Sequence, residues 1–406
     1  MKAIIVHCDG MASPTAPFSE TTPLAKAATP NLDWLANHGD FGAFALPSGS
    51  ELISDVTHLA LLGYDPQKFY SGPAPFEAVS LDVHLDKGDV AFLGQLVTLR
   101  SVGGRGDEKK LGPQIILDDD QAGGIDTEEA RELIDGLNDQ LASEIIQFYA
   151  GKRHRHLMVW VGGTGRYGCS NPRLALGKSV DGFLPKGEGA KFVLELMEAS
   201  RIVLRHHPVN EERVQAGLKP ANCLWLWGPG KAMELPVFTE RYGLSGVTLS
   251  PDTLHVGVGL SVGFSLAQDV EEWNWDGPDY RSIAESCFTW LRTKDVVYLH
   301  FPMNGSSAGG MGDLIEIIER FDDQVIGPLL AALRDQPDLR VLIASNPPVT
   351  DGASFTATVA PYVMCRHPMK QSDGRRTVFH ELAASRQYGG VPREATKLIE
   401  RLLARE

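Results

Sequence analysis

The chain begins with MKAIIVHCDG, Met1–Gly10, an apolar run that ends in Asp9 and Gly10. A short continuous apolar run followed by turn residues is typical of a buried strand, so we expect one from Ala3 to Cys8. This strand would carry the carboxylate of Asp9 to its carboxyl end. In open α/β sheets ligands bind at that edge. Asp9 is therefore the first candidate for a functional residue.

Strand and helix patterns alternate along the rest of the chain. Compact apolar runs predict further central strands at 223–227, 296–300 and 341–344, and alternating polarity predicts a half-buried strand at 89–99. Apolar residues with helical spacing predict helices at 31–37, 54–62, 128–141, 190–204, 280–291, 314–333 and 393–403. Strands that alternate with helices indicate an α/β fold with a parallel sheet.

The composition limits the class of protein and its partners. A chain of 406 residues, 43% hydrophobic and 22% charged, is long enough for two globular domains. Its 38 Lys and Arg against 52 Asp and Glu give a net charge of -14, which repels nucleic-acid phosphates and anionic lipids. No apolar run reaches the roughly 18 residues of a membrane span. We expect a cytoplasmic protein without nucleic-acid or membrane partners, and a homo-oligomer stays open.

Generic motifs give little direct guidance. Gly163-x-Gly165-x-x-Gly168 follows a strand-like run but lacks the helix that a dinucleotide fingerprint requires, and the 12 histidines form few clusters along the sequence. Ser54 stands at the start of a predicted helix, where Ser is a preferred N-cap. A serine there is also well placed as a nucleophile, because the N-terminal end of a helix binds phosphate. Both explanations of Ser54 stay open on the residues alone.

Longer stretches of the sequence resemble one family. The segment TPLAKAATPNLDWLA at 22–36 is similar to the segment after the first strand in archaeal-type, 2,3-bisphosphoglycerate-independent phosphoglycerate mutases of the alkaline phosphatase superfamily. Ser54-Asp55-Val56, followed by LLGYDP at 61–66, resembles the nucleophile helix of that family. Further matches keep the family's order at 88–92, 96–98, 155–157, 207–210, 220–222 and 225–231.

The resemblance implies a fold and a chemistry. The fold is an alkaline-phosphatase-like parallel-sheet core flanked by helices, formed by residues 1–70 and 220–406, with a smaller inserted α+β domain at 71–219. The chemistry uses two divalent ions, Mn, Mg or Zn, and a serine that is transiently phosphorylated while phosphate moves between the 3- and 2-hydroxyls of glycerate.

Site residues follow from the same resemblance, position by position. Asp9 corresponds to a metal ligand, and Ser54 corresponds to the catalytic nucleophile, which also contacts the metal. Arg155, Arg213 and Lys219 are candidates for binding the anionic groups of a small phosphorylated acid.

The chain departs from the family in three loops that carry metal ligands. Residues 301–312, FPMNGSSAGGMG, contain neither Asp nor His, where the family has both. The family's Asp-His-Pro is Ser345-Asn346-Pro347 here, and the His of its final His-Thr-Ala is Phe355. Asp9 is then the only recognisable carboxylate for two divalent cations, and even unit charges about 4 Å apart repel by about 4 kcal/mol at an effective dielectric of 20.

Because these metal ligands are missing, the sequence does not decide whether the protein binds metal or is an active enzyme. We expect a catalytically degenerate, phosphoglycerate-mutase-like protein that serves as a binding or regulatory protein or hosts altered chemistry. The alternative is an active cofactor-independent mutase that converts 3-phosphoglycerate to 2-phosphoglycerate, or a related phosphatase, through phosphoserine at Ser54.

Overall fold

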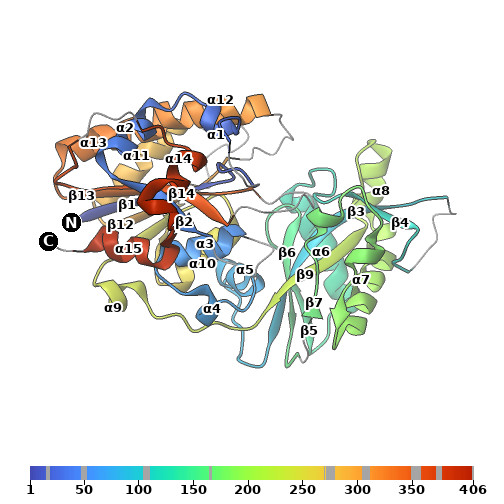
Figure 1. The fold of residues 1–406 in the computed structure, drawn as a ribbon. Coiled ribbons are helices and arrows are strands. Elements are labelled where there is room, and N and C mark those ends of the chain that lie inside the picture. Colours follow the sequence, from blue (N-terminus) through green and yellow to red (C-terminus); the bar gives the residue numbers. More distant parts are fainter. Residues whose placement is uncertain are drawn as a thin grey trace. The chain divides into compact units, whose positions relative to one another are not determined.

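The computed structural model describes residues 1–14, 19–46, 53–103, 110–163, 167–268, 270, 279–303, 311–348, 358–371 and 377–404. The chain divides into two compact units (Figure 1). Unit 1 comprises Met1–Phe69, Leu235–Val349 and Ser354–Glu406, and unit 2 is formed mainly by Tyr70–Glu234.

An eight-stranded sheet forms the centre of unit 1, in the order β11-β10-β12-β1-β13-β14-β2-β15. In that order the strands are Ser265–Leu266, Gly246–Leu249, Val296–Pro302, Lys2–Asp9, Leu339–Asn346, Val359–Cys365, Asp40–Ala45 and Arg393–Glu394. β14 is antiparallel to both neighbours, and the other adjacent strands pair in parallel. The predicted α/β fold with a mostly parallel sheet is confirmed.

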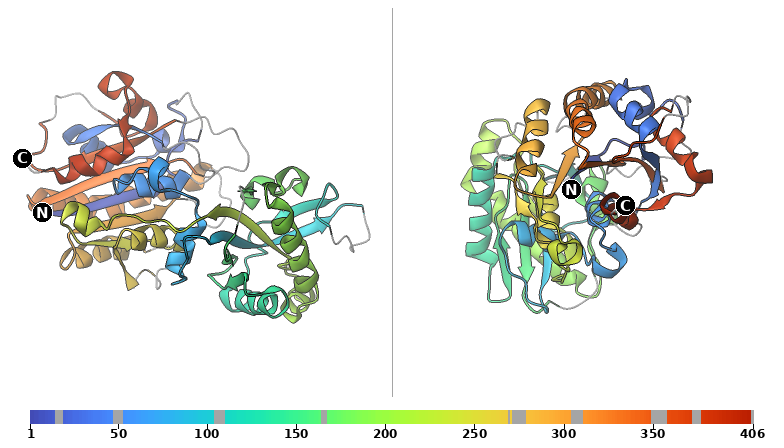
Figure 2. Two further views of the ribbon diagram at one scale, coloured as in Figure 1. Left: turned by 90° about the horizontal axis from the view of Figure 1, so that it is seen from below. Right: turned by 90° about the vertical axis from the view of Figure 1, so that its left-hand side faces the viewer.

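Helices cover both faces of this sheet (Figure 2). They are α1 (Pro23–Lys26), α2 (Pro30–His38), α3 (Ile53–Leu61), α4 (Pro66–Phe69), α9 (Phe238–Tyr242), α10 (Thr253–Ser261), α11 (Tyr280–Leu291), α12 (Met311–Phe321), α13 (Gly327–Asp335), α14 (Glu381–Ser385) and α15 (Ala395–Leu403). Side chains alternate across a strand. Ile4, Val6 and Cys8 of β1 accordingly enter one hydrophobic core, which leaves His7 and Asp9 for the opposite face.

The helix predicted at 314–333 is interrupted. A π-helical turn at Asp322–Ile326 separates α12 from α13. The turn places the carboxylate of Asp322 against the N-terminus of α2, where it accepts hydrogen bonds from the backbone N–H groups of Asn31 at 3.0 Å and Leu32 at 2.8 Å. Because α2 has no side-chain cap from its own N-cap Thr29, this distant carboxylate takes over the capping.

Unit 2 contains a second sheet, with β4 (Ile115–Asp119), β3 (Val90–Ser101), β6 (Arg155–Trp160) and β5 (Ile146–Tyr149) in that order, and β9 (Cys223–Gly230) also paired to β3. All of these pairs are antiparallel. The remaining elements are α5 (Ala74–Ser80), α6 (Thr127–Leu141), α7 (Ala190–Arg205), α8 (Pro208–Gln215), the two-residue strands β7 (Tyr167–Gly168) and β8 (Lys186–Gly187), and short 3-10 turns.

One expected strand lies in the other sheet. The apolar run at 223–227, predicted as a central strand of the core, is β9 and pairs with β3. Residues 220–234 therefore belong to unit 2, not to the core segment 220–406 of the sequence-based division. The pattern identified a buried strand correctly, but an apolar run does not specify which sheet it joins.

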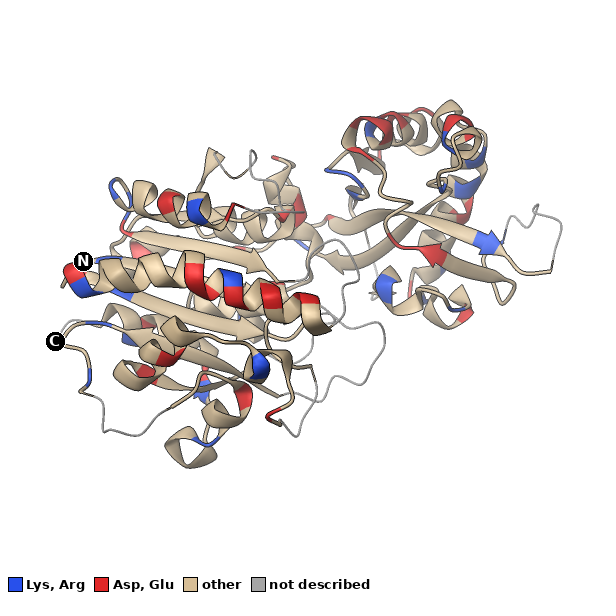
Figure 3. Ribbon diagram, turned by 90° about the horizontal axis from the view of Figure 1, so that it is seen from above, with Lys and Arg blue, Asp and Glu red and all other residues tan. Residues whose placement is uncertain are grey.

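Charged residues of both signs are interspersed along the helices in Figure 3. Within the described part of the chain, no helix has both the length and the apolar character required to cross a membrane.

Candidate active site

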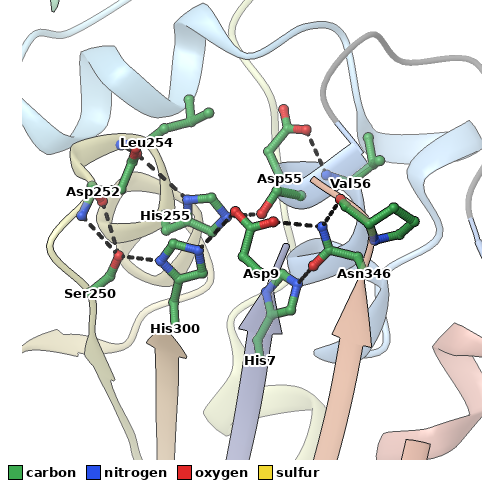
Figure 4. Close-up of polar contacts among 12 residues, drawn as sticks. His7, Asp9, Asp55, Val56, Ser250, Asp252, Leu254, His255, His300 and Asn346 are labelled. Atoms are coloured by element: carbon green, nitrogen blue, oxygen red, sulfur yellow. Dashed lines mark hydrogen bonds and ion pairs between the residues drawn. The ribbon is translucent and has the colours of Figure 1, made fainter. Parts of the chain in front are cut away.

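The centre of the site is built by three neighbouring strands of unit 1. His7 of β1 is the register partner of His300 on β12, and Asp9 of β1 is the register partner of Asn346 on β13. Paired residues of adjacent strands face the same side of a sheet. His7, Asp9, His300 and Asn346 therefore converge at the carboxyl edge that the sequence indicated (Figure 4).

Two helices bring further polar groups to this edge. Ser54 is the second residue of α3, and its hydroxyl shares a hydrogen bond with Nε2 of His255 at 2.8 Å. His255 belongs to the first turn of α10, which Asp252 caps. The N-cap explanation of Ser54 is therefore wrong, because Ser54 lies inside the helix and its hydroxyl is bonded to an imidazole. His58 lies one turn after Ser54 on the same face of α3.

Hydrogen bonds connect Asp9 to its neighbours on both sides. Asn346 donates through Nδ2 to Asp9 Oδ1 at 2.6 Å, and Nε2 of His300 lies 3.4 Å from Asp9 Oδ2. The amide oxygen of Asn346 accepts a bond from Nε2 of His7. The Asp9 side chain is 21% exposed, whereas that of His300 is 1% exposed. Asp9 is thus the partly open end of an otherwise buried network.

Two of the histidines, His7 and His300, are also held from behind by a hydrogen bond at Nδ1, whereas Nδ1 of His255 has no hydrogen-bond partner among the described residues. The hydroxyl of Tyr298 lies 2.9 Å from Nδ1 of His7, and the hydroxyl of Ser250 lies 2.9 Å from Nδ1 of His300. Nδ1 of His255 lies 3.6 Å from Asp252 Oδ1. The three rings therefore turn their Nε2 atoms toward Asn346, Asp9 and Ser54 respectively.

Burial sets the charge of these groups. Burial and then the neighbouring His300 lower the pKa of His7 to about 3, and burial and then His255 lower the pKa of His300 to about 4. Burial is also the main cause that lowers the pKa of His58. Burial is the largest single influence on Asp9 and would raise its pKa, but the hydrogen bond from His300 and the combined effect of His300, His7 and His255 outweigh it, so the net shift is downward. At neutral pH the site therefore combines neutral imidazoles with an ionised carboxylate.

A fourth histidine fills the gap between the strands and α3. The ring of His58 stacks on Tyr298 with centroids 3.7 Å apart and lies 5.5 Å from the ring of His255. It is fully buried, and neither of its nitrogens has a hydrogen-bond partner among the described residues.

The donor atoms present were tested against the two divalent ions that the resemblance implies. Each of His7, His255 and His300 offers a nitrogen, and these nitrogens lie within 4.8 Å of one another, so the group could hold a metal ion. Asp9 adds one carboxylate. This nitrogen-rich set suits a single transition-metal ion, whereas a pair of ions needs several carboxylates to offset its charge. Among the residues that the structure describes, the donors fit one ion and do not fit two.

At the positions where the family has metal ligands, the structure shows what the substituted residues do. Asn346 lies at the site and contributes a neutral amide, while the buried hydroxyl of Ser345 donates to the carbonyl of Pro361 at 3.3 Å. Phe355 lies outside the described residues, as does most of the loop at 301–312. The histidines form few clusters along the sequence, but the fold gathers four of them, His7, His58, His255 and His300, into one cluster in space.

The predicted anion-binding residues all lie in unit 2. Arg213 is 3% exposed; it pairs with Glu129 and donates to the carbonyls of Lys219 and Ala122. Lys219 pairs with Asp118 at 2.9 Å and with a second carboxylate at 3.4 Å. Arg155 begins β6 opposite Gln95. The structure thus engages Arg213 and Lys219 in internal ion pairs, and substrate binding by these residues stays a prediction.

Comparisons with known proteins agree on one family. The sequence model of the family described as 2,3-bisphosphoglycerate-independent phosphoglycerate mutase matches residues 36–210. A probable 2,3-bisphosphoglycerate-independent phosphoglycerate mutase from Geobacter sulfurreducens is 34% identical over 409 residues, covering 100% of both chains. The mutase from Methanosarcina barkeri is 32% identical over 406 residues, covering 98% of both.

Solved structures share the fold. The cofactor-independent phosphoglycerate mutase from Thermoplasma acidophilum superposes with a TM-score of 0.59 at 24% identity, covering 99% of this chain and 98% of that chain. A protein from Pyrococcus horikoshii superposes with a TM-score of 0.72 at 21% identity, covering 100% and 98%. These structures support the alkaline-phosphatase-like fold, and relatives that match along the whole sequence identify the chain as a member of the 2,3-bisphosphoglycerate-independent phosphoglycerate mutase family.

Proposed function

We propose that this protein is an active phosphoglycerate-mutase-type phosphotransferase that uses Ser54 as its nucleophile. The observation that carries the proposal is the 2.8 Å contact between the Ser54 hydroxyl and Nε2 of His255, a histidine close enough to Asp9 to lower the pKa of its carboxyl. A serine in contact with an imidazole that has a carboxylate behind it is a common arrangement for an activated nucleophile. Relatives named as phosphoglycerate mutases along the full chain support the same activity.

The reaction would proceed in two transfers of one phosphoryl group. In the first, a bond forms between Ser54 Oγ and phosphorus as the ester bond of the phosphorylated acid breaks, and the alkoxide that leaves is protonated. In the second, the other hydroxyl of the bound glycerate takes the phosphoryl group back from Ser54. The small phosphorylated acid is 3-phosphoglycerate, and the product is 2-phosphoglycerate.

The residues of this chain hold Ser54 ready for that step. Nε2 of His255 holds the hydroxyl proton of Ser54, and Asp252 lies behind the imidazole. The first turn of α3 presents backbone N–H groups beside the hydroxyl, and these attract phosphate oxygens. A divalent ion bound by His7, His255 and His300 would take the place of the contact between His255 and Ser54, and it would then supply the positive charge that favours both an ionised Ser54 oxygen and the phosphoryl oxygens.

A second function is binding of a phosphorylated acid without turnover, as in a catalytically degenerate relative. It is favoured by one specific observation, the neutral amide of Asn346 and the inward-bonded hydroxyl of Ser345 where the family has ligands. The names of the relatives favour the active enzyme over this second function.

Trapping the phosphorylated serine tests the proposal. The protein is incubated with 3-phosphoglycerate, quenched in acid, digested and analysed by mass spectrometry for a phosphopeptide that contains Ser54. We expect phosphate on Ser54 in the natural protein and none in Ser54→Ala. Ser282→Ala, which removes a hydroxyl bonded only to Asp279 in α11, is the control and should label normally. Unlabelled Ser54 in a protein that binds 3-phosphoglycerate would establish the second function instead.

A further inference from the structure

We propose that the Nε2 atoms of His7, His255 and His300, together with the carboxylate of Asp9, bind one zinc-class transition-metal ion in place of the two ions implied by the family. The inference rests on the proposed function only in locating the ion at the phosphoryl-transfer site. The binding itself follows from how the three imidazoles are held.

The first observation is convergence. His7 and His300 are register partners on adjacent strands, with ring centroids 5.4 Å apart, and the rings of His255 and His300 stack at 3.6 Å. One nitrogen from each ring lies within 4.8 Å of the other two. A tetrahedral zinc ion with bonds of about 2.0–2.1 Å holds its ligand nitrogens about 3.4 Å apart. Small side-chain rotations would therefore suffice to bring the three nitrogens to one ion.

The second observation is the outer partner of each ring. Histidines that bind metal are oriented by a hydrogen bond from their other nitrogen to a neighbouring oxygen. Here Nδ1 of His7 contacts Tyr298, and Nδ1 of His300 contacts Ser250. Nδ1 of His255 lies 3.6 Å from Asp252 without a hydrogen bond, so the outer partner is formed for two of the three rings and is near at hand for the third. Hydroxyl groups accept as well as donate hydrogen bonds, so Nδ1 can carry the ring proton when Nε2 binds an ion.

The third observation is what the three Nε2 atoms now contact. They are bonded to the amide oxygen of Asn346, the hydroxyl of Ser54 and the carboxylate of Asp9. If an ion binds between the three Nε2 atoms, each of these nitrogens gives up its present hydrogen bond and binds the ion instead. The carboxylate oxygen of Asp9 and the hydroxyl oxygen of Ser54 would then lie beside the bound ion. Three nitrogens and a carboxylate oxygen make the four-coordinate set that zinc prefers.

The donor chemistry and the charge both select one ion of this class. Mg²⁺ requires about six oxygen ligands, and Mn²⁺ binds nitrogen donors more weakly than zinc does. One divalent ion beside ionised Asp9, with Asp252 behind His255, leaves little net charge. A second ion would add two uncompensated positive charges within a few ångströms.

The experiment measures bound metal directly. The full chain is stripped with a chelator, equilibrated with equal concentrations of Zn²⁺, Mn²⁺ and Mg²⁺, freed of unbound ions and analysed by mass spectrometry of the elements. We expect one zinc per chain, with manganese and magnesium far below one. Cobalt substituted for zinc should give the intense visible bands of four-coordinate Co²⁺.

Variants locate the ion. His255→Asn and His300→Asn should lower bound zinc at least tenfold, whereas His58→Asn, which alters a buried imidazole of the same cluster without an outer partner, should retain one zinc. Because a strand variant can fail to fold, Ser250→Ala provides a milder test. Removing an outer partner typically weakens metal affinity by about 10- to 100-fold, measured by competition with a zinc chelator.

Some outcomes would overturn the inference. They are two bound manganese or magnesium ions, no bound zinc, or undiminished zinc in folded His255→Asn. Its failure is distinguishable from failure of the proposed function: a metal-free protein that still phosphorylates Ser54 contradicts only the metal site, and a zinc protein with unlabelled Ser54 contradicts only the mutase.

Discussion

Asn346 and Asp9 are register partners on β13 and β1, and the amide of Asn346 donates to the carboxylate of Asp9 over 2.6 Å. A neutral donor therefore stabilises the charge of Asp9 from the position where the family's Asp-His-Pro sequence has a metal ligand. The contact adds a hydrogen bond to a carboxylate whose pKa the neighbouring histidines, His300 first, already lower, and it suggests a charge-changing variant.

Asn346→Asp is expected to destabilise the metal-free protein and to make its stability depend on cations. Two carboxylates about 4 Å apart repel by about 4 kcal/mol at an effective dielectric of 20. In chelator-treated protein we expect the free energy of unfolding to fall by about 2–4 kcal/mol, and to recover when a divalent ion is added. Asn346→Ala adds no charge and serves as the control. An equal response of both variants to the ion would contradict the electrostatic explanation.

Asp322→Ala is expected to lower the stability of unit 1. The carboxylate of Asp322 accepts the backbone N–H groups of Asn31 and Leu32 in the first turn of α2. Removing it leaves two buried donors unpaired, a loss of about 2–4 kcal/mol in the free energy of unfolding by denaturant titration. The neighbouring exposed Asp323, replaced by Ala, should change stability by less than about 0.5 kcal/mol. A small effect at Asp322 would show that α2 is capped in another way.

Replacing Arg213 separates a structural role from the predicted anion-binding role. Its buried guanidinium joins Glu129 of α6 to the backbone at Ala122 and Lys219. We expect Arg213→Ala to lower the free energy of unfolding of unit 2 by about 2–4 kcal/mol, because the carbonyls of Ala122 and Lys219 lose their donor. Arg213→Lys should not restore it, since Lys lacks the planar fork. A variant of normal stability with a raised KM for phosphoglycerate would instead support anion binding.

Acidification is expected to destabilise unit 2 through His156. This ring is fully buried, Nδ1 accepts a bond from the N–H of Gly151, and burial followed by His154 lowers its pKa to about 3. Because the folded-state pKa lies below that of the unfolded chain, the stability is present above about pH 6.5 and is lost as pH falls toward 3.

The size of this effect is measurable against a variant that cannot titrate. Between about pH 7.5 and about pH 5 the loss through His156 should be about 2 kcal/mol. Hydrogen exchange of β3 and β6 reports the stability of unit 2, and His156→Asn should lose about 2 kcal/mol less than the natural protein over the same range. Parallel pH profiles of the two proteins would contradict the assignment.

The sequence predicted the architecture because each element has a local signature. The apolar run at 3–8 and the helical spacing at 31–37 and 280–291 correspond to β1, α2 and α11. Two features escaped local patterns. The run at 223–227 joined the sheet of unit 2, and the π-helical turn at Asp322–Ile326 divided the helix predicted at 314–333. Both depend on partners distant in sequence.

The site was predicted in part. The sequence predicted that Asp9 ends a strand and that Ser54 stands at the start of a helix, and the structure has them at the end of β1 and in the first turn of α3. Their roles stay predictions. The histidine cluster was missed since its members are separated by up to about 290 residues and form no motif. Local signals existed: His7 stands two residues before Asp9 on a strand, and His58 stands four residues after Ser54 on a helix, so each pair shares a face. Only the fold brings His255 and His300 to them.

Interconversion of phosphoglycerates is the most direct test of the central claim that Ser54 transfers a phosphoryl group. The full chain, supplied with zinc or with manganese in separate samples, is mixed with 3-phosphoglycerate and followed by phosphorus NMR beside Ser54→Ala. We predict that 2-phosphoglycerate accumulates to equilibrium with the natural protein and that Ser54→Ala forms none above background. No product from the natural protein with either ion, or equal product from Ser54→Ala, would contradict the account.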